Sequence, residues 1–248
     1  MPKKLETNFK RIETKYIVPK NQLDDLISDL KKYLVEDDYP TSTITNIYFD
    51  NKNFEIIKDS INHKYHQEKI RMRTYVAEPK PNSLGFLEIK KKDDEGVGHK
   101  FRIASNPLSI TQFVTQGITD EHITDSDLIE EIHSLRERYE NLVPRMFIYY
   151  DRYSLKEKHT IKGYSFTNTR VTIDKNLTFR DENVSFFEGK HGEPLLDDAH
   201  VIMEIKAPGH KPDWLQAILD KYGLEEKHFS KYNTAYHKSQ KLPIKHSL

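Results

Sequence analysis

The fold is decided by the stretch Leu87-Glu88-Ile89-Lys90-Lys91-Lys92, of which Met203-Glu204-Ile205-Lys206 is a near copy. In both stretches charged and apolar residues alternate with period two. This alternation is typical of a β-strand, because successive side chains of a strand point to opposite faces. The same pattern recurs along the chain around Glu13 and Lys15, Arg71 and Arg73, Tyr150 and Arg152, and Arg170 with Thr172 and Asp174.

Two architectures would explain so many half-charged strands. The simpler one is a sheet with one wet face and one face packed on helices. The other closes the sheet into a barrel of about eight strands, wide enough to hold a small ligand, with the charged face inside and helices outside. The pattern favours an α+β fold, an eight-stranded antiparallel β-barrel with a charged lumen flanked by helices.

A lumen rich in Lys and Arg favours a polyanionic ligand, because guanidinium forks and ammonium groups both bind phosphate oxygens. Strand parity selects nine candidate lining residues, of which Lys92 and Lys100 lie near a turn: Lys15, Arg71, Arg73, Lys90, Lys92, Lys100, Arg152, Arg170 and Lys206. Each could instead be a solvated surface charge. The carboxylates on the same faces, Glu13, Glu88 and Glu204, could hold Mg²⁺ or Mn²⁺ beside phosphate, or form salt bridges with the neighbouring cations.

Composition limits the other possibilities. At 248 residues, with no linker-like segment, the chain is expected to form one domain over residues 1–248. The formal net charge is zero, which argues against a nucleic-acid partner held by a global basic field. The chain has no cysteine, no secretory signal and no apolar run near the roughly 20 residues of a membrane span, so a cytoplasmic location is expected.

Periodicity and turn residues predict the order of the elements. The expected strands are 9–18, 43–50, 64–76, 85–92, 97–103, 142–156, 164–179 and 199–207. The expected helices are 20–34, 54–60, 109–117, 125–139, 213–222 and 227–238. No Gly-rich phosphate loop, serine-hydrolase motif or histidine spacing typical of a zinc site is present in the sequence.

Several short motifs resemble, in the same order, those of the VTC (vacuolar transporter chaperone) domain, a branch of the triphosphate tunnel superfamily that also contains the CYTH proteins. The first is Arg11-Ile-Glu13-Thr-Lys15-Tyr16. The later ones are Asn46-Ile-Tyr48-Phe49-Asp50, Lys69-Ile-Arg71-Met-Arg73, Leu87-Glu88-Ile-Lys90, Tyr150-Asp-Arg152, Thr169-Arg170-Val-Thr-Ile-Asp174, Met203-Glu204-Ile-Lys206 and Ser230-Lys231-Tyr232. The resemblance extends from about residue 8 to residue 238.

The resemblance implies an eight-stranded tunnel and a polyphosphate polymerase that uses ATP and a divalent metal, typically manganese. It implies catalytic roles on phosphate for Lys15, Arg71, Arg73, Lys90, Arg152, Arg170 and Lys206. It implies substrate binding by Lys100, Tyr150, Ser230 and Lys231, and metal binding by Glu204.

The sequence departs from the family pattern at two places. Many hydrolysing relatives begin with E-x-E-x-K, and Arg11 stands at the first glutamate here, which removes a metal ligand and favours transfer over hydrolysis. A second basic residue expected just before Ser230 is His228, which is only partly charged at neutral pH. Eukaryotic members carry membrane helices and a phosphate-sensing domain, so any coupling to a membrane channel would here need a separate membrane-protein partner.

The sequence therefore predicts a polyphosphate polymerase that acts on ATP and inorganic polyphosphate with Mn²⁺ or Mg²⁺. Two alternatives stay open. One is a triphosphatase that hydrolyses a nucleoside or inorganic triphosphate in the same tunnel. The other is a polyphosphate-binding subunit without turnover.

Overall fold

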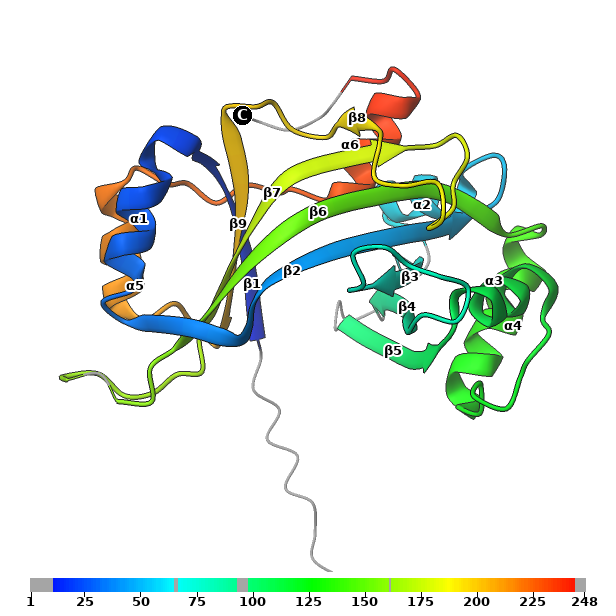
Figure 1. Ribbon diagram of the computed structural model, residues 1–248, viewed down its shortest axis with the longest axis horizontal. Coiled ribbons are helices and arrows are strands. Elements are labelled where there is room, and N and C mark those ends of the chain that lie inside the picture. Colours follow the sequence, from blue (N-terminus) through cyan, green and yellow to red (C-terminus); the bar gives the residue numbers. More distant parts are fainter. Residues whose placement is uncertain (1–10, 65–66, 93–97, 161, 244–248) are drawn as a thin grey trace, which may run out of the picture.

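The computed structural model describes residues 11–64, 67–92, 98–160 and 162–243, apart from the side chain of Arg11 (Figure 1). The expected strand starts at residues 9 and 97 therefore lie outside the described residues.

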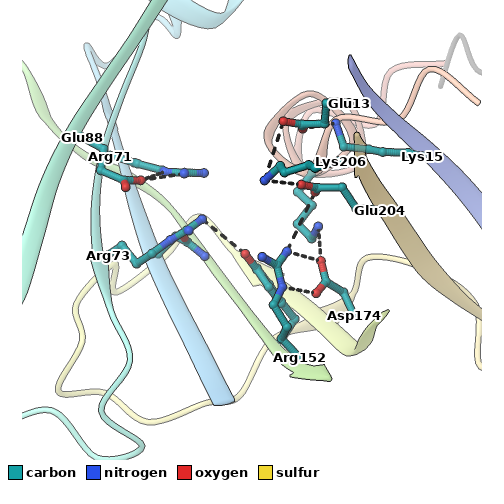
Figure 2. A network of polar contacts seen from close by, with 12 residues as sticks. Glu13, Lys15, Arg71, Arg73, Glu88, Arg152, Asp174, Glu204 and Lys206 are labelled. Carbon is teal, nitrogen blue, oxygen red and sulfur yellow. Dashed lines mark hydrogen bonds and ion pairs between the residues drawn. The ribbon is translucent and has the colours of Figure 1, made fainter. Parts of the chain in front are cut away.

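One antiparallel sheet forms the centre of the molecule, with the strand order β1-β9-β7-β6-β2-β3-β4-β5 and β8 added beside β7. Its strands are β1 (Arg11–Pro19), β2 (Leu34–Asp50), β3 (Lys69–Thr74), β4 (Gly85–Lys92), β5 (Gly98–Ser105), β6 (Val143–Glu157), β7 (Arg170–Arg180), β8 (Glu193–Pro194) and β9 (His200–Pro208). The sheet curls, so that β3 and β4 face β1 and β9 across its concave side (Figures 1 and 2).

The prediction of a closed eight-stranded barrel was wrong. Among the described residues the sheet has nine strands, and β1 and β5 end it without pairing with each other. The strand registers explain why. β3 pairs with residues 45–49 of β2, which lie opposite residues 144–149 of β6. β9 instead pairs with the part of β7 that lies opposite residues 152–156 of β6. At about 3.3 Å per residue, the centres of these two ranges are offset by roughly 25 Å along β6. The short strand β5 consequently lies apart from β1 and does not run alongside it (Figure 1).

The outer faces of the sheet are apolar and covered by helices, as predicted. The helices α3 (Pro107–Gln116) and α4 (Ser126–Tyr139) cover β2 to β5 in a core that includes Phe49, Leu87 and Phe113. The helices α1 (Leu23–Leu30) and α5 (Asp213–Lys221), with the short 3-10 helix Lys20–Gln22 before α1, cover β1, β7 and β9. The alternation seen in the sequence therefore sorts the charged face from the buried one correctly.

One helix lies where the sequence did not place it. The helix α6 (Lys231–Ser239) packs, together with α2 (Glu55–Ile61), against Ile148, Phe179 and Ile202. These residues belong to the inner face of the sheet, since Ile148 shares parity with Arg152 and Ile202 with Glu204. The helix therefore fills one end of the concavity and brings its N-terminus to the charged lining.

Most predicted boundaries are close to those of the structure, with five exceptions. The strand expected at 43–50 begins at Leu34, the helix expected at 20–34 ends at Leu30, and the strand expected from 164 begins at Arg170. The strand expected from 64 begins at Lys69, and the helix expected from 227 begins at Lys231. Among the helices of the described part of the chain, none is both long and apolar enough to cross a bilayer.

Candidate functional site

A cavity of about 150 Å³ lies on the concave face of the sheet, and charged side chains dominate its lining. It is lined by eight cations, two carboxylates, two tyrosines and one serine: Lys15, Lys69, Arg71, Arg73, Lys90, Arg152, Lys206, Lys231, Glu13, Glu204, Tyr48, Tyr150 and Ser230. Figure 2 shows labelled charged side chains in two facing groups, with those of β3 and β4 on one side (Arg71, Arg73 and Glu88) and those of β1, β9, β7 and β6 on the other (Glu13, Lys15, Glu204, Lys206, Asp174 and Arg152). The excess of cations over carboxylates gives the cavity a positive potential, which favours an anionic ligand.

In the wall formed by β3 and β4, Arg71 is held by a buried glutamate. Its Nε and Nη2 atoms lie 2.7 and 2.6 Å from Oε2 of Glu88. The other oxygen of Glu88 lies 2.6 Å from Nζ of Lys100. Burial opposes the ionisation of Glu88, but the combined attraction of Arg71, Arg73 and Lys100 outweighs it, so the pKa of Glu88 lies below its usual range. Glu88 therefore fixes the positions of Arg71 and Lys100.

The other cations of this wall are not neutralised. Arg73 donates from Nε to Oδ1 of Asn46 at 2.8 Å and from Nη2 to the Tyr150 hydroxyl at 3.3 Å, and both acceptors are uncharged. Lys69 and Lys90 pair with no carboxylate among the residues that the structure describes. Loss of hydration, reinforced by Arg71, lowers the pKa of Lys90 to about 8, although its side chain is open to the cavity, and burial likewise lowers the pKa of Lys69. Lys69, Arg73 and Lys90 are therefore available to bind an anionic ligand.

The facing wall pairs its cations with carboxylates, both within β1 and β9 and between these two strands. Lys206 Nζ lies 2.7 Å from Oε1 of Glu204 and 3.8 Å from Oε2 of Glu13, and Lys15 lies 3.3 Å from Glu13. Because Glu13 opposes Lys206 and Lys15 opposes Glu204 in the register, the four charges alternate on one face. Burial raises the pKa of Glu204, but Lys206 together with Arg152 and Lys231 holds it well below its usual range.

A third group joins β6, β7 and α6. Arg152 makes a two-pronged contact with Asp174, through Nε to Oδ1 at 2.6 Å and Nη2 to Oδ2 at 2.8 Å. Lys231, the first residue of α6, lies 2.6 Å from the same carboxylate. Despite its full burial, Asp174 stays ionised, because Lys231 and Arg152 lower its pKa. Ser230 caps the helix by accepting from the backbone N–H of Asn233 at 3.4 Å.

Ten of the twelve residues to which the family resemblance gives a role line this cavity. Of the other two, Lys100 lies behind Arg71 on Glu88, and Arg170 is exposed and lines an adjoining outer cavity. Their roles, like those of the ten, stay predictions. Tyr48, Lys69 and Asp174 received no predicted role from the sequence. Lys69 precedes Arg71 and Arg73 at the same period-two spacing, so strand parity could have identified it.

The cavity offers a divalent cation two carboxylates, and a bound phosphate would have to supply further ligands. In the described part of the chain no three Asp, Glu or His side chains gather as a complete metal site. However, Glu13 and Glu204 share the ammonium of Lys206, so a cation already lies between the two carboxylates. Mg²⁺ and similar ions commonly use one or two carboxylates together with phosphate oxygens and water. A metal bound here would need phosphate to complete its ligands.

Comparison with known proteins identifies one family and a set of distant structural neighbours, which includes the two solved structures described below. The sequence model of the VTC domain matches residues 10–240. No curated protein matches the chain. An X-ray structure of a Vibrio parahaemolyticus protein assigned as an adenylate cyclase is 13% identical, with a TM-score of 0.42, and the match covers 91% of this chain and 97% of that one. A chain of the Schizosaccharomyces pombe Mediator head module is 10% identical, with a TM-score of 0.41 and coverage of 86% and 90%.

Proposed function

Because the chain belongs to the VTC domain family, we propose that it is a polyphosphate polymerase that transfers the γ-phosphate of ATP to the end of an inorganic polyphosphate chain. One observation carries the proposal: eight cations and two carboxylates converge on a single cavity. Phosphoryl transfer depends on positioning and charge neutralisation rather than on a protein nucleophile, and this lining supplies both.

In the proposed reaction an oxygen of the terminal phosphate of the chain attacks the γ-phosphorus. The bond from that phosphorus to the β–γ bridging oxygen breaks, ADP leaves, and the polymer gains one phosphate. Arg73, Lys69 and Lys90 would bind the transferring and accepting phosphates, because none of them forms a direct ion pair with a carboxylate among the described residues. Arg71 and Arg152, fixed by Glu88 and Asp174, would orient them.

Mn²⁺ or Mg²⁺ would be held by Glu204 with Glu13 and would neutralise phosphate oxygens when bound. The family pattern at position 11 supports transfer, because an arginine stands where hydrolysing relatives have a glutamate. The triphosphatase remains the competing function, since two carboxylates beside a phosphate site also suit hydrolysis.

The test is to incubate the purified full chain with ATP and MnCl₂ and to measure ADP, long-chain polyphosphate and free phosphate separately. The proposal expects ADP and polymer-bound phosphate in equal amounts, with little free phosphate. Glu204→Gln is the matched control: it should fold normally, bind Mn²⁺ more weakly in an electron-spin-resonance titration, and make no polymer. Release of phosphate mainly as monomer would replace the polymerase by a triphosphatase. Binding of polyphosphate without any ADP would indicate a non-catalytic subunit.

A further inference from the structure

Asn46 is a buried side chain of β2 that shares the inward parity of Tyr48. In the strand register it stands opposite Ile148 of β6 on one side and opposite Arg73 of β3 on the other. Its Nδ2 atom donates to the backbone oxygen of Ile148 at 3.1 Å, and its Oδ1 atom accepts from Nε of Arg73 at 2.8 Å. A carbonyl only accepts and a guanidinium only donates, so this position needs one donor and one acceptor, which an amide supplies.

Arg73 is held by uncharged groups. Besides Asn46, it donates from Nη2 to the Tyr150 hydroxyl at 3.3 Å and from Nη1 to the Tyr75 hydroxyl at 3.5 Å. Each of its three nitrogen atoms therefore has an acceptor, yet Arg73 forms no direct ion pair with a carboxylate in the part of the chain that the structure describes. The guanidinium is thus fixed in direction without being neutralised.

The two other arginines of the cavity show what a carboxylate does in the same role. Arg71 gives Nε and Nη2 to Glu88, and Arg152 gives Nε and Nη2 to Asp174. Such a carboxylate orients the guanidinium, but its negative charge also offsets the attraction of the guanidinium for phosphate. Asn46 orients an arginine without adding that charge.

We propose that Asn46 is a positioning residue of the phosphate site, which directs the guanidinium of Arg73 and leaves its charge available to a bound polyanion. The inference rests on the proposed function for the phosphate nature of the ligand, and it adds a residue that does not itself line the cavity. An aspartate at this position would keep the contact with Arg73. It would also neutralise the guanidinium and would lose the donor to Ile148.

The test compares two variants by calorimetry with inorganic tripolyphosphate at neutral pH. Asn46→Thr is uncharged and suits a strand, but its side chain is too short to hold Nε of Arg73. It should weaken binding by about 2- to 12-fold, the range of one net hydrogen bond. Asn46→Asp keeps the shape of the side chain but should weaken binding by about 12- to 140-fold, the range of a charge-assisted hydrogen bond, because the guanidinium then has a carboxylate partner.

The matched control makes the same change of charge elsewhere. Asn106→Asp, at the N-cap of α3 and outside the cavity, keeps a capping side chain. It should change binding by less than about twofold, because salt screens a charge outside the site. Binding by Asn46→Asp should also weaken less steeply with sodium chloride than binding by Asn46→Thr, since one fewer unpaired cation faces the ligand.

The order of the two losses decides the inference. If Asn46 served the fold alone, aspartate would be the milder change, so a loss in Asn46→Asp no larger than that in Asn46→Thr would overturn the inference. A second measurement does not depend on the folding of Asn46→Asp. Asn46→Thr should add little to the loss in an Arg73→Ala background, and additive losses would also overturn the inference.

The assay needs no turnover, so its result is separable from the polymerase assay. The expected order of losses in a protein that makes no polymer would support the positioning role and reject the polymerase. Polymer synthesis by the unmodified protein, with equal losses in the two variants at position 46, would do the reverse.

Discussion

Arg71 and Arg73 occupy successive inward positions of β3, yet their removal leaves different groups behind. Glu88 is fully buried and depends on Arg71, whereas Arg73 contacts only uncharged acceptors. A buried carboxylate that loses its main charged partner costs more than an uncharged acceptor that loses one hydrogen bond. The same wall of the cavity therefore contains one residue that serves stability and binding together, and one that is free to serve binding.

We expect Arg73→Ala to keep most of the stability and to lower polymer synthesis by about 10²-fold, as removal of a group at a developing charge commonly does. Arg71→Ala should lower synthesis and also reduce the free energy of unfolding by about 1–3 kcal/mol, because Glu88 then keeps only Lys100 and Arg102. Urea denaturation and the polymer assay measure the two effects. Equal destabilisation by the two variants would contradict the distinction.

The lowered pKa of Lys90 predicts that the stability of the fold and the binding of a polyanion both depend on pH. Its pKa is about 8 in the folded protein, against the usual 10.5. Between these values the unfolded chain holds a proton that the folded one lacks, so this group makes stability rise with pH through that window. A bound polyanion favours the charged form, so binding should take up protons near pH 8 and weaken above it.

Calorimetry of tripolyphosphate binding at pH 8, in two buffers of different ionisation enthalpy, measures this proton uptake. Lys90→Met should show less uptake and a shallower loss of affinity between pH 7 and pH 9. Because the titration of the ligand itself is common to both proteins, the difference reports on Lys90. Identical uptake by the two proteins would show that other groups titrate.

At the scale of elements, α6 is held on the concave face by a buried contact next to the site. Asp50 accepts from the backbone N–H groups of Ile56 and Ile57, each at 3.0 Å, and from the Tyr232 hydroxyl at 2.9 Å. The Tyr232 ring stacks on Tyr48 with ring centres 4.3 Å apart. Asp50 thus ties the start of α2 to the first turn of α6, directly after Lys231.

Tyr232→Phe should therefore weaken tripolyphosphate binding by about 2- to 12-fold, the range of one net hydrogen bond, by loosening the position of Lys231. In a Lys231→Met background the same change should have little further effect, so a double-mutant cycle shows coupling. Tyr236→Phe, on the same helix, is the control. Additive losses would indicate that Tyr232 stabilises the fold without positioning the lysine.

At the scale of the whole molecule, the two walls face each other across an open sheet, and cations outnumber carboxylates in the cavity between them. The chain has zero formal net charge, but its cavity gathers eight cations and two carboxylates. A bound polyanion would attract both walls at once. Because β1 and β5 are joined by no hydrogen bonds in the described residues, such a ligand would add a link that the backbone does not supply.

Tripolyphosphate should consequently raise the midpoint of thermal unfolding. At 100 times its Kd, a ligand of the folded state adds about 2.7 kcal/mol to the free energy of unfolding. Scanning calorimetry with tripolyphosphate, and with sodium chloride at the same ionic strength, separates binding from screening. A shift equally large in sodium chloride would mean that salt relieves repulsion without specific binding.

The sequence by itself determined which side chains share a face. Period two is imposed by the geometry of a strand, so parity placed Arg71, Arg73, Lys90, Arg152 and Glu204 on one side before any contact was known, and they line one cavity. Helix periodicity likewise identified the helices, with small errors at their ends.

Only the tertiary structure decided which faces meet and which charges pair. The offset of β3 and β9 along the long central strands leaves the sheet open, and no local pattern encodes that offset. The inner position of α6 and the pairing of Asp174 with Lys231 join residues far apart in the chain. The period-two pattern gives the direction of a side chain from its neighbours in the sequence alone. Its ion-pair partner, in contrast, depends on how the whole chain packs. The sequence could therefore place Arg73 and Lys90 on the inner face, but it could not show that they lack a paired carboxylate.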